Sequence, residues 1–181
     1  MTDKRRVHIS KHLRHEPEAI GLTLEPGGWV LIEDLLAASA RAGVRFTREE
    51  LAEVVRRCDK QRFAIDETGA KIRANQGHST EVDLQFEPAE PPAELFHGTA
   101  ARNLDAILRA GLLKMARHHV HLSPETATAL KVGSRQGKPV TLVVDAARMR
   151  SEGYVFFRSA NGVWLVEHVP PQYLRVLDPE N

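Results

Sequence analysis

The chain has 181 residues, with 25 Lys and Arg against 24 Asp and Glu, so its net charge of +1 excludes a polycation. Any binding of nucleic acid must therefore use a local basic patch rather than a global excess of charge. The fractions of hydrophobic residues (42%) and charged residues (27%) are typical of a soluble globular protein with one domain or two small lobes.

The single cysteine, Cys58, excludes an internal disulfide and a cysteine-based zinc cluster, and we expect it to pack as a small apolar side chain. No apolar run approaches the roughly 20 residues that a membrane span needs, and the first ten residues lack the apolar core of a signal peptide. We expect a cytoplasmic protein with no membrane contact. No exposed apolar stripe stands out, so we also expect a monomer.

The first predicted element is a helix over 5–15 ("RRVHISKHLRH"), which the following Glu16-Pro17 must end. Arg14 and His15 lie at this end. Cations are common in the last turn of a helix because they oppose its negative end. The same pair is also suited to grip a phosphate, and the helix alone does not decide between the two interpretations.

Two more helices and a hairpin follow. Residues 27–43 predict a brief extended stretch that turns into a helix, and residues 46–59 predict a helix capped by Thr47, with Glu50 completing a capping box. Residues 62–75 alternate apolar and polar around a Glu-Thr-Gly turn, which is typical of a β-hairpin. Three helices and a hairpin in this order predict a winged-helix module.

An acidic, proline-rich linker near 83–93 divides the chain into predicted domains 1–88 and 89–181. In the second domain we expect a strand over 94–100 that runs into a turn. A helix follows, with Leu104, Ile107 and Leu108 inward and Gly111 as its stop. Further strands are predicted at 118–123, 139–149, 154–160, 162–169 and 174–178. One helix followed mainly by strands predicts an α+β lobe with a largely antiparallel sheet.

Several side chains in these elements have two interpretations. Alternation puts Arg62 on the hairpin face opposite Phe63, where most arginines are simply solvated. Arg117 precedes His119 and His121, which share one face of a strand. The two histidines suit a zinc site, although no third ligand is apparent, and they equally suit hydrogen bonding in a cleft.

Two glycine-containing segments are also ambiguous. Gly98 lets a ligand approach the backbone, while Thr99 and the amides near Asn103 suit an anion or a ribose hydroxyl; an ordinary strand-to-helix turn is the alternative. Arg135 lies between two glycines in "GSRQGKP". This segment is either a loop that touches phosphate or an exposed hairpin connection.

The motifs "LRHEPEAIGL", "GWVLIEDLL", "RFAID", "IRANQGHS", "FHGT", "GLLKMARHHVHLS" and "GKPVTLVVDA" span nearly the whole chain in this order. Together they resemble the RNA 2′-phosphotransferase family, the tRNA 2′-phosphotransferase of fungi and its bacterial and archaeal relatives. The resemblance implies an α+β fold of two lobes. The N-terminal lobe is a winged helix that handles RNA, and the C-terminal lobe has the ADP-ribosyltransferase fold and binds NAD⁺.

Carried over residue by residue, the resemblance predicts a catalytic phosphate clamp of Arg14, His15, Arg62 and Arg117. It also predicts an NAD⁺ site, with either His119 or His121 facing the nicotinamide riboside. The predicted NAD⁺-binding residues are His97, Gly98, Thr99, Asn103, His119, His121, Ser123 and Arg135.

The reaction that the resemblance implies removes an internal 2′-phosphate from RNA, such as a tRNA splicing product, with NAD⁺ as co-substrate. It passes through an ADP-ribosylated 2′-phospho-RNA and yields 2′-OH RNA, ADP-ribose 1″,2″-cyclic phosphate and nicotinamide. We expect no metal, because arginines supply the counter-charge.

Two other functions fit the same residues. An ADP-ribosyltransferase that caps terminal phosphates of RNA or DNA needs the same clamp. Modification of a protein is less favoured, because the fold mates that do this usually rely on a glutamate to activate the acceptor. Glu167 is the nearest candidate for that role. The alternative from another class is a winged-helix nucleic-acid binding protein that senses NAD⁺, against which the net charge of +1 argues.

Overall fold

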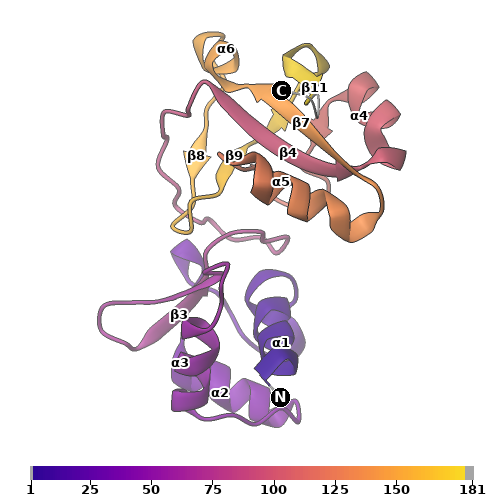
Figure 1. The fold of residues 1–181 in the computed structure, drawn as a ribbon. Helices are drawn as coiled ribbons and strands as arrows, with labels where there is room; N and C mark the ends of the chain where they lie inside the picture. The colour runs from indigo at the N-terminus through magenta and orange to yellow at the C-terminus, as the bar shows by residue number, and fades with distance from the viewer. Residues whose placement is uncertain (1, 178–181) are drawn as a thin grey trace. The chain divides into compact units, whose positions relative to one another are not determined.

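The computed structural model of the protein describes residues 2–177, and the chain divides into two compact units, Met1–Phe86 and Glu87–Asn181 (Figure 1). The boundary falls inside the segment 83–93, which has no helix and no named strand. Helices occur together with strands that all pair antiparallel, which confirms the α+β class. No helix in the described part of the chain is long and apolar enough to cross a membrane.

The first unit consists of three helices and one small sheet of strand order β1-β3-β2 (Figure 1). Its elements are α1 (Thr2–Arg14), β1 (Trp29–Leu31), α2 (Ile32–Arg41), α3 (Arg48–Arg56), β2 (Phe63–Ile65) and β3 (Lys71–Ala74). The predicted helices, the extended stretch before α2 and the hairpin are therefore confirmed. Arg62 lies one residue before the hairpin's first strand.

Local chemistry sets the ends of these helices. α1 stops at Arg14 because the residue before Pro17 is disfavoured in a helix, and its last turn carries three basic side chains. α3 begins with the predicted capping box. The Thr47 hydroxyl accepts from the Glu50 amide, and the Glu50 carboxylate accepts from the Thr47 amide.

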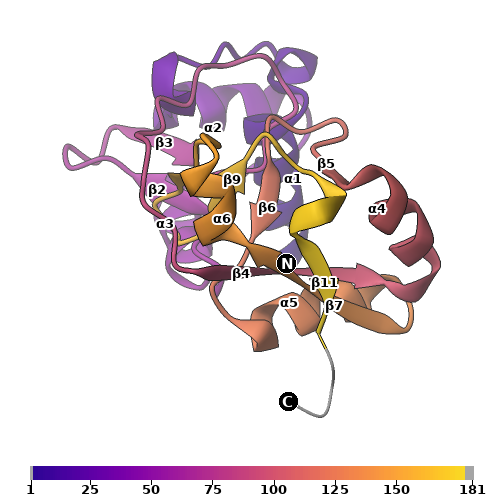
Figure 2. The same ribbon diagram turned by 90° about the horizontal axis from the view of Figure 1, so that it is seen from above.

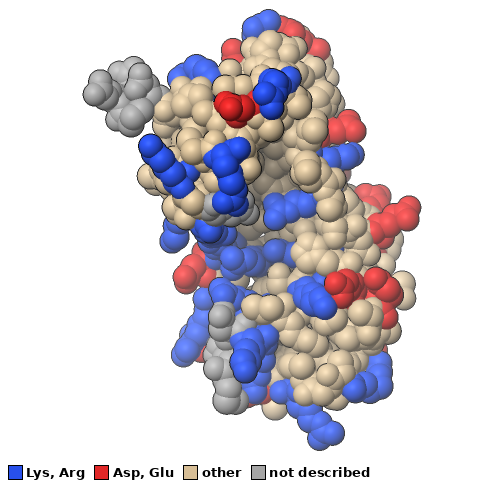
Figure 3. Space-filling model, turned by 90° about the vertical axis from the view of Figure 1, so that its right-hand side faces the viewer, with Lys and Arg blue, Asp and Glu red and all other residues tan. Residues whose placement is uncertain are grey.

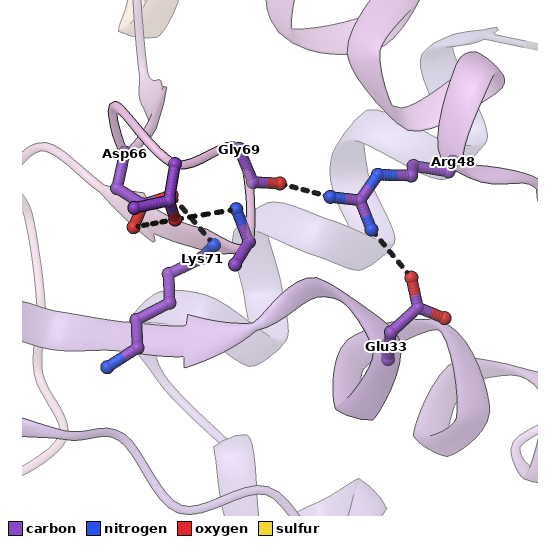
Figure 4. A network of polar contacts seen from close by, with 7 residues as sticks. Glu33, Arg48, Asp66, Gly69 and Lys71 are labelled. Carbon is purple, nitrogen blue, oxygen red and sulfur yellow. Dashed lines mark hydrogen bonds and ion pairs between the residues drawn. The ribbon is translucent and has the colours of Figure 1, made fainter.

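Polar contacts connect the hairpin turn to both neighbouring helices (Figure 4). The Asp66 carboxylate accepts from the Lys71 amide at 2.9 Å, which closes the turn. Arg48, the first residue of α3, donates to the carbonyl oxygen of Gly69 in the turn and to Glu33 of α2 at 2.7 Å. One guanidinium thus fixes the turn between β2 and β3 relative to two helices.

The core of the first unit lies between the helices and the inner face of the sheet. Cys58 is buried with a free thiol, which confirms that it packs as an apolar side chain. The buried residues are Ile9, Leu13, Ile20, Leu22, Val30, Ile32, Leu35, Ala38, Leu51, Val54, Cys58, Phe63, Ile72 and Ala74.

The second unit contains two three-stranded sheets, β11-β7-β4 and β6-β9-β8, and a short pair, β10-β5 (Figure 2). The backbones of Phe96 and Ser123 exchange two hydrogen bonds of 2.8 Å and so join the two larger sheets. Its helices are α4 (Leu104–Ala110), α5 (Thr126–Gly133) and α6 (Ala146–Ser151). Its strands are β4 (Glu94–Ala100), β5 (Leu112–Leu113), β6 (Val120–Leu122), β7 (Pro139–Asp145), β8 (Phe157–Arg158), β9 (Trp164–Val166), β10 (His168–Val169) and β11 (Leu174–Val176).

Two of these helices correct the prediction from the sequence. α5 was not expected, and residues 146–149 form part of α6 rather than the end of a strand. The strand stops at Asp145 because its carboxylate accepts from the Arg148 amide at 3.0 Å and so caps α6. Ala146 and Met149 are buried on the inner face of that helix. Asp178, the end of the last predicted strand, lies outside the described residues.

The predicted face of α4 is partly wrong. Leu104 and Ile107 pack against the core, but Leu108 is 40% exposed. The helix has only seven residues, and Leu108 follows Ile107 by one position, which turns it about 100° away from the core. Gly111 does end the helix, with φ +83°.

Candidate functional site

In the first unit, the structure brings Arg14 and Arg62 together. The Arg14 guanidinium donates to the carbonyl oxygen of Arg62 at 3.4 Å and lies over the ring of Phe63, 6.0 Å from its centroid. The Arg62 guanidinium donates to Sγ of Cys58 at 3.6 Å. The Arg14 side chain therefore connects the end of α1 to the backbone just before β2, while the Arg62 side chain is directed to Cys58.

His15 joins this cluster through a residue that sequence reasoning missed. Its Nδ1 lies 2.8 Å from the Ser79 hydroxyl, and the amides of Ser79 and Thr80 donate to the carbonyl oxygen of Arg14. The loop after β3 thus caps the end of α1. The only sequence signal was that Ser79 closes the motif "IRANQGHS", to which no role was given.

In the second unit, His97 lies inside a strand, and this corrects the expected turn. His97, Gly98 and Thr99 all belong to β4 and pair with Leu142, Thr141 and Val140 of β7. The strand continues through Ala100 because seven consecutive residues pair with the long strand β7. The side chain of His97 therefore projects from a sheet and not from a loop.

The environment of His97 fixes its tautomer. Nδ1 lies 3.1 Å from the carbonyl oxygen of His121. A carbonyl can only accept, so Nδ1 carries the proton, and the neutral ring presents Nε2 as an acceptor. Burial lowers the pKa of His97, the hydrogen bond to His121 raises it, and the nearby Arg117 charge lowers it; the net direction is downward.

Arg117 and His121 form a second polar pair. Nη1 of Arg117 lies 3.0 Å from Nδ1 of His121. A guanidinium only donates, so the Nδ1 atom accepts and the His121 ring keeps its proton on Nε2. The arginine predicted for the clamp is therefore held beside one of the two candidate histidines of the NAD⁺ site.

Gly98 allows the backbone of a helix to pack closely against its strand. A Cβ atom on Gly98 would lie 1.6 Å from the carbonyl oxygen of Ala129, and one on Gly133 would lie 2.7 Å from the carbonyl oxygen of Thr99. The backbone of α5 runs against β4 at this point (Figure 1). The close backbone approach that we expected at Gly98 is made by the protein's own helix.

The remaining predicted NAD⁺ residues have local roles. Asn103 stands at the N-cap of α4 without capping it, because a preceding 3₁₀ turn leaves it in a helical conformation; its side chain donates to the Thr99 hydroxyl at 3.4 Å. The Ser123 hydroxyl bonds both to the carbonyl oxygen and to the amide of Glu125, which orders the entry to α5. Arg135 is exposed in a 3₁₀ turn that links α5 to β7, so the segment is not a hairpin connection.

A cavity of about 470 Å³ lies in the second unit. Among the predicted site residues only His119 lines it, and its ring contacts Phe157 edge-on at 5.5 Å. Burial lowers the pKa of His119 most, and the electrostatic effects of His118 and Lys114 also lower it, while Glu167 raises it; the net direction is downward. The lining residues are Lys114, His118, His119, Gly153, Tyr154, Val155, Phe157, Val166, Glu167 and His168.

Within residues 2–177, no group of three or more His, Cys, Asp or Glu is arranged to hold a metal ion. His119 and His121 have different partners, Phe157 for the one and Arg117 for the other. Figure 3 shows one face on which several Lys and Arg side chains gather, while most acidic side chains lie nearer its edges.

The fold and the two sites define an α+β protein whose arginines and histidines lie in small clusters. Such clusters are suited to binding anionic ligands that carry phosphate. The family model described as "RNA 2'-phosphotransferase, Tpt1 / KptA family" matches residues 4–168. The chain belongs to this family.

Similar curated proteins cover nearly the whole chain and are named "Probable RNA 2'-phosphotransferase". The protein from Nostoc punctiforme is 55% identical over 179 residues, which cover 97% of this chain and 99% of that protein. The Streptomyces griseus protein is 56% identical and covers 92% of each chain. The Herpetosiphon aurantiacus protein is 54% identical and covers 95% of this chain and 97% of its own.

Proposed function

We propose that the protein removes an internal 2′-phosphate from RNA and transfers it to ADP-ribose, with NAD⁺ as co-substrate. The observation that carries the proposal is the family match over residues 4–168. The hydrogen bond from the Arg14 guanidinium to the Arg62 backbone, next to His15, supports it from the side of the chemistry, because it brings the two chain segments that carry these arginines together. The RNA is tRNA-like in this proposal, and the reaction takes place in the cytoplasm.

In the first step, an oxygen of the 2′-phosphate bonds to the anomeric carbon of the nicotinamide riboside. The bond to nicotinamide breaks, and nicotinamide leaves as a neutral molecule. Arg14, Arg62 and Arg117 bind the phosphate dianion through charge-assisted hydrogen bonds and orient it. This step needs little beyond positioning, because the leaving group is already cationic before departure.

In the second step, the 2″-hydroxyl of the transferred ADP-ribose attacks the phosphorus, and the bond from phosphorus to the RNA 2′-oxygen breaks. The products are 2′-OH RNA and ADP-ribose 1″,2″-cyclic phosphate. Charge develops on the phosphoryl group, so the arginines contribute more here than in the first step. His15 positions the phosphate first and then acts as an acid or base.

The hydrogen-bonding and charged groups of the second unit suit NAD⁺ as a ligand. The neutral His97 ring presents an acceptor on Nε2 that suits a ribose hydroxyl, and His121 presents a donor on its own Nε2. Arg135 is exposed and suits a pyrophosphate oxygen. We propose on this basis that the second unit is the ADP-ribosyltransferase-like lobe. Three helices and an antiparallel sheet support a winged-helix lobe for the first unit.

The test is to incubate the purified protein with an RNA that carries one internal 2′-phosphate, with and without NAD⁺, and to follow phosphate loss and nicotinamide release together. We expect both only with NAD⁺, and we expect Arg117→Ala to accumulate ADP-ribosylated RNA. Nicotinamide release with retention of the 2′-phosphate would instead indicate another acceptor, such as a terminal phosphate. If neither reaction occurs, the remaining alternative is a nucleic-acid binding protein without this activity.

A further inference from the structure

The cavity of the second unit has aromatic walls, and apart from His119, a predicted NAD⁺ residue, the proposed reaction gives these rings no role. Five rings line it, including that of His118. The other four form two pairs that contact edge-on: His119 with Phe157 at 5.5 Å, and Tyr154 with His168 at 5.5 Å. The Tyr154 ring also contacts the Tyr173 ring edge-on at 5.6 Å. Rings fixed in this way offer flat apolar surfaces to a planar ligand without a large loss of side-chain entropy.

Polar groups at the cavity complement the rings. Lys114 and Glu167 both line it and lie 3.5 Å apart, with Lys114 roughly half exposed. An ammonium donates to carbonyl oxygens, and a carboxylate accepts from exocyclic amino groups, which are the groups on the edges of nucleobases. The volume of about 470 Å³ lies within the range of roughly 300–1,000 Å³ that small-molecule sites occupy.

One turn connects the cavity to the proposed catalytic centre. The Arg117 amide donates to the carbonyl oxygen of Lys114 at 3.0 Å, so the two residues close a tight turn. The cavity is lined by three residues around this turn, Lys114, His118 and His119. The guanidinium of Arg117 instead forms a hydrogen bond with His121. A phosphate held by Arg117 would therefore leave the neighbouring nucleoside within reach of the aromatic walls.

We propose that this cavity binds one unpaired nucleobase of the RNA, from a nucleotide adjoining the 2′-phosphate. The inference rests on the proposed function and adds the way in which the enzyme recognises single-stranded RNA around its target. Single-stranded RNA is commonly bound by stacking its bases on aromatic side chains. Stacking of one base is worth roughly 5- to 100-fold in affinity.

The experiment compares short single-stranded RNAs with one internal 2′-phosphate, one with all its bases and others abasic at the nucleotide before or after the phosphate. With the unaltered protein we expect one abasic position to raise KM roughly 5- to 100-fold, with little change in kcat. The variant Val155→Trp places a bulky ring at the cavity from a residue that is 52% exposed. It should raise KM for the complete RNA and leave KM for the sensitive abasic RNA nearly unchanged.

Val176→Trp is the matched control, because Val176 is similarly exposed, at 42%, and does not line the cavity. It should keep the full difference between complete and abasic RNA. If Val155→Trp does not fold, Lys114→Ala on its exposed side chain replaces it with the same expectation, in smaller degree.

Three results would overturn the inference and leave the proposed function intact, and a fourth would overturn both. Equal KM values for complete and abasic RNAs would remove the base contact while leaving the proposed function intact. Multiplicative effects of the abasic site and Val155→Trp would place the base elsewhere. If Val155→Trp raises KM for NAD⁺ and leaves KM for RNA unchanged, the cavity binds the adenine of the dinucleotide instead. If none of the RNAs loses its 2′-phosphate, the proposed function is refuted, and the inference with it.

Discussion

The Ser79 hydroxyl lies 2.8 Å from Nδ1 of His15, so the loop that follows β3 orients the ring that follows α1. His15 is exposed and comes directly after the last helical residue, where the backbone alone would leave its ring free to rotate. Ser79 is therefore a positioning residue for a proposed catalytic histidine.

We expect Ser79→Ala to lower kcat by about 2- to 10-fold, since one hydrogen bond of roughly 1 kcal/mol orients the ring. KM for NAD⁺ should stay the same. Ser79→Thr keeps the hydroxyl and should restore most of the activity. Steady-state kinetics of the two variants check the prediction, and equal rates for Ala and Thr would show that the hydroxyl has no part in it.

Arg62→Ala should lower kcat by roughly 100-fold or more, because removal of one group that stabilises transition-state charge has this magnitude. ADP-ribosylated RNA should accumulate, since the second step depends more on the arginines. Arg56→Ala is the control, because Arg56 is exposed and pairs only with Glu53 of its own helix. Normal turnover of Arg62→Ala at saturating RNA would contradict a catalytic role.

Gly98→Ala should destabilise the protein by about 3 kcal/mol or more, because the new Cβ atom would meet backbone atoms of Ala129 that cannot move without displacing α5. Gly133→Ala should cost less, since its closest contact would be 2.7 Å rather than 1.6 Å. Chemical denaturation of both variants measures the two free energies of unfolding, and the reverse order would show that α5 packs differently.

Acid should destabilise the protein in part through His97. Its pKa is lowered in the folded state, mainly by burial, so the unfolded chain binds more protons just below the ordinary pKa of 6.5. This contribution to the free energy of unfolding is complete above that pH and is lost as the pH falls toward the lowered pKa. His8 and His119 contribute with the same sign.

His97→Asn should weaken this dependence, because the Asn amide can donate to the carbonyl oxygen of His121 without titrating. Urea unfolding at pH 7.5, 6.5 and 5.5 gives the comparison. An identical loss of stability in the variant and the unaltered protein would mean that His97 does not contribute.

Local patterns predicted much of the fold. The capping box at Thr47 and Glu50 placed the start of α3, and the Glu-Thr-Gly turn placed the hairpin β2–β3. Each depends on contacts among residues close in the sequence, which the chain itself specifies. α5 and α6 were missed because short helices depend mainly on packing, and packing is not visible in a local window.

The sequence by itself determined the α+β class, the family and the residue types of the candidate clusters, because these follow from motifs and periodicity along the chain. The tertiary structure alone decided which groups meet. The side chain of Ser79 contacts His15, that of Arg117 contacts His121, and the backbone of α5 packs against Gly98. These pairs are contacts through space, and most join residues far apart in the chain. Their geometry depends on how strands pair and helices pack, which no local pattern of residues specifies.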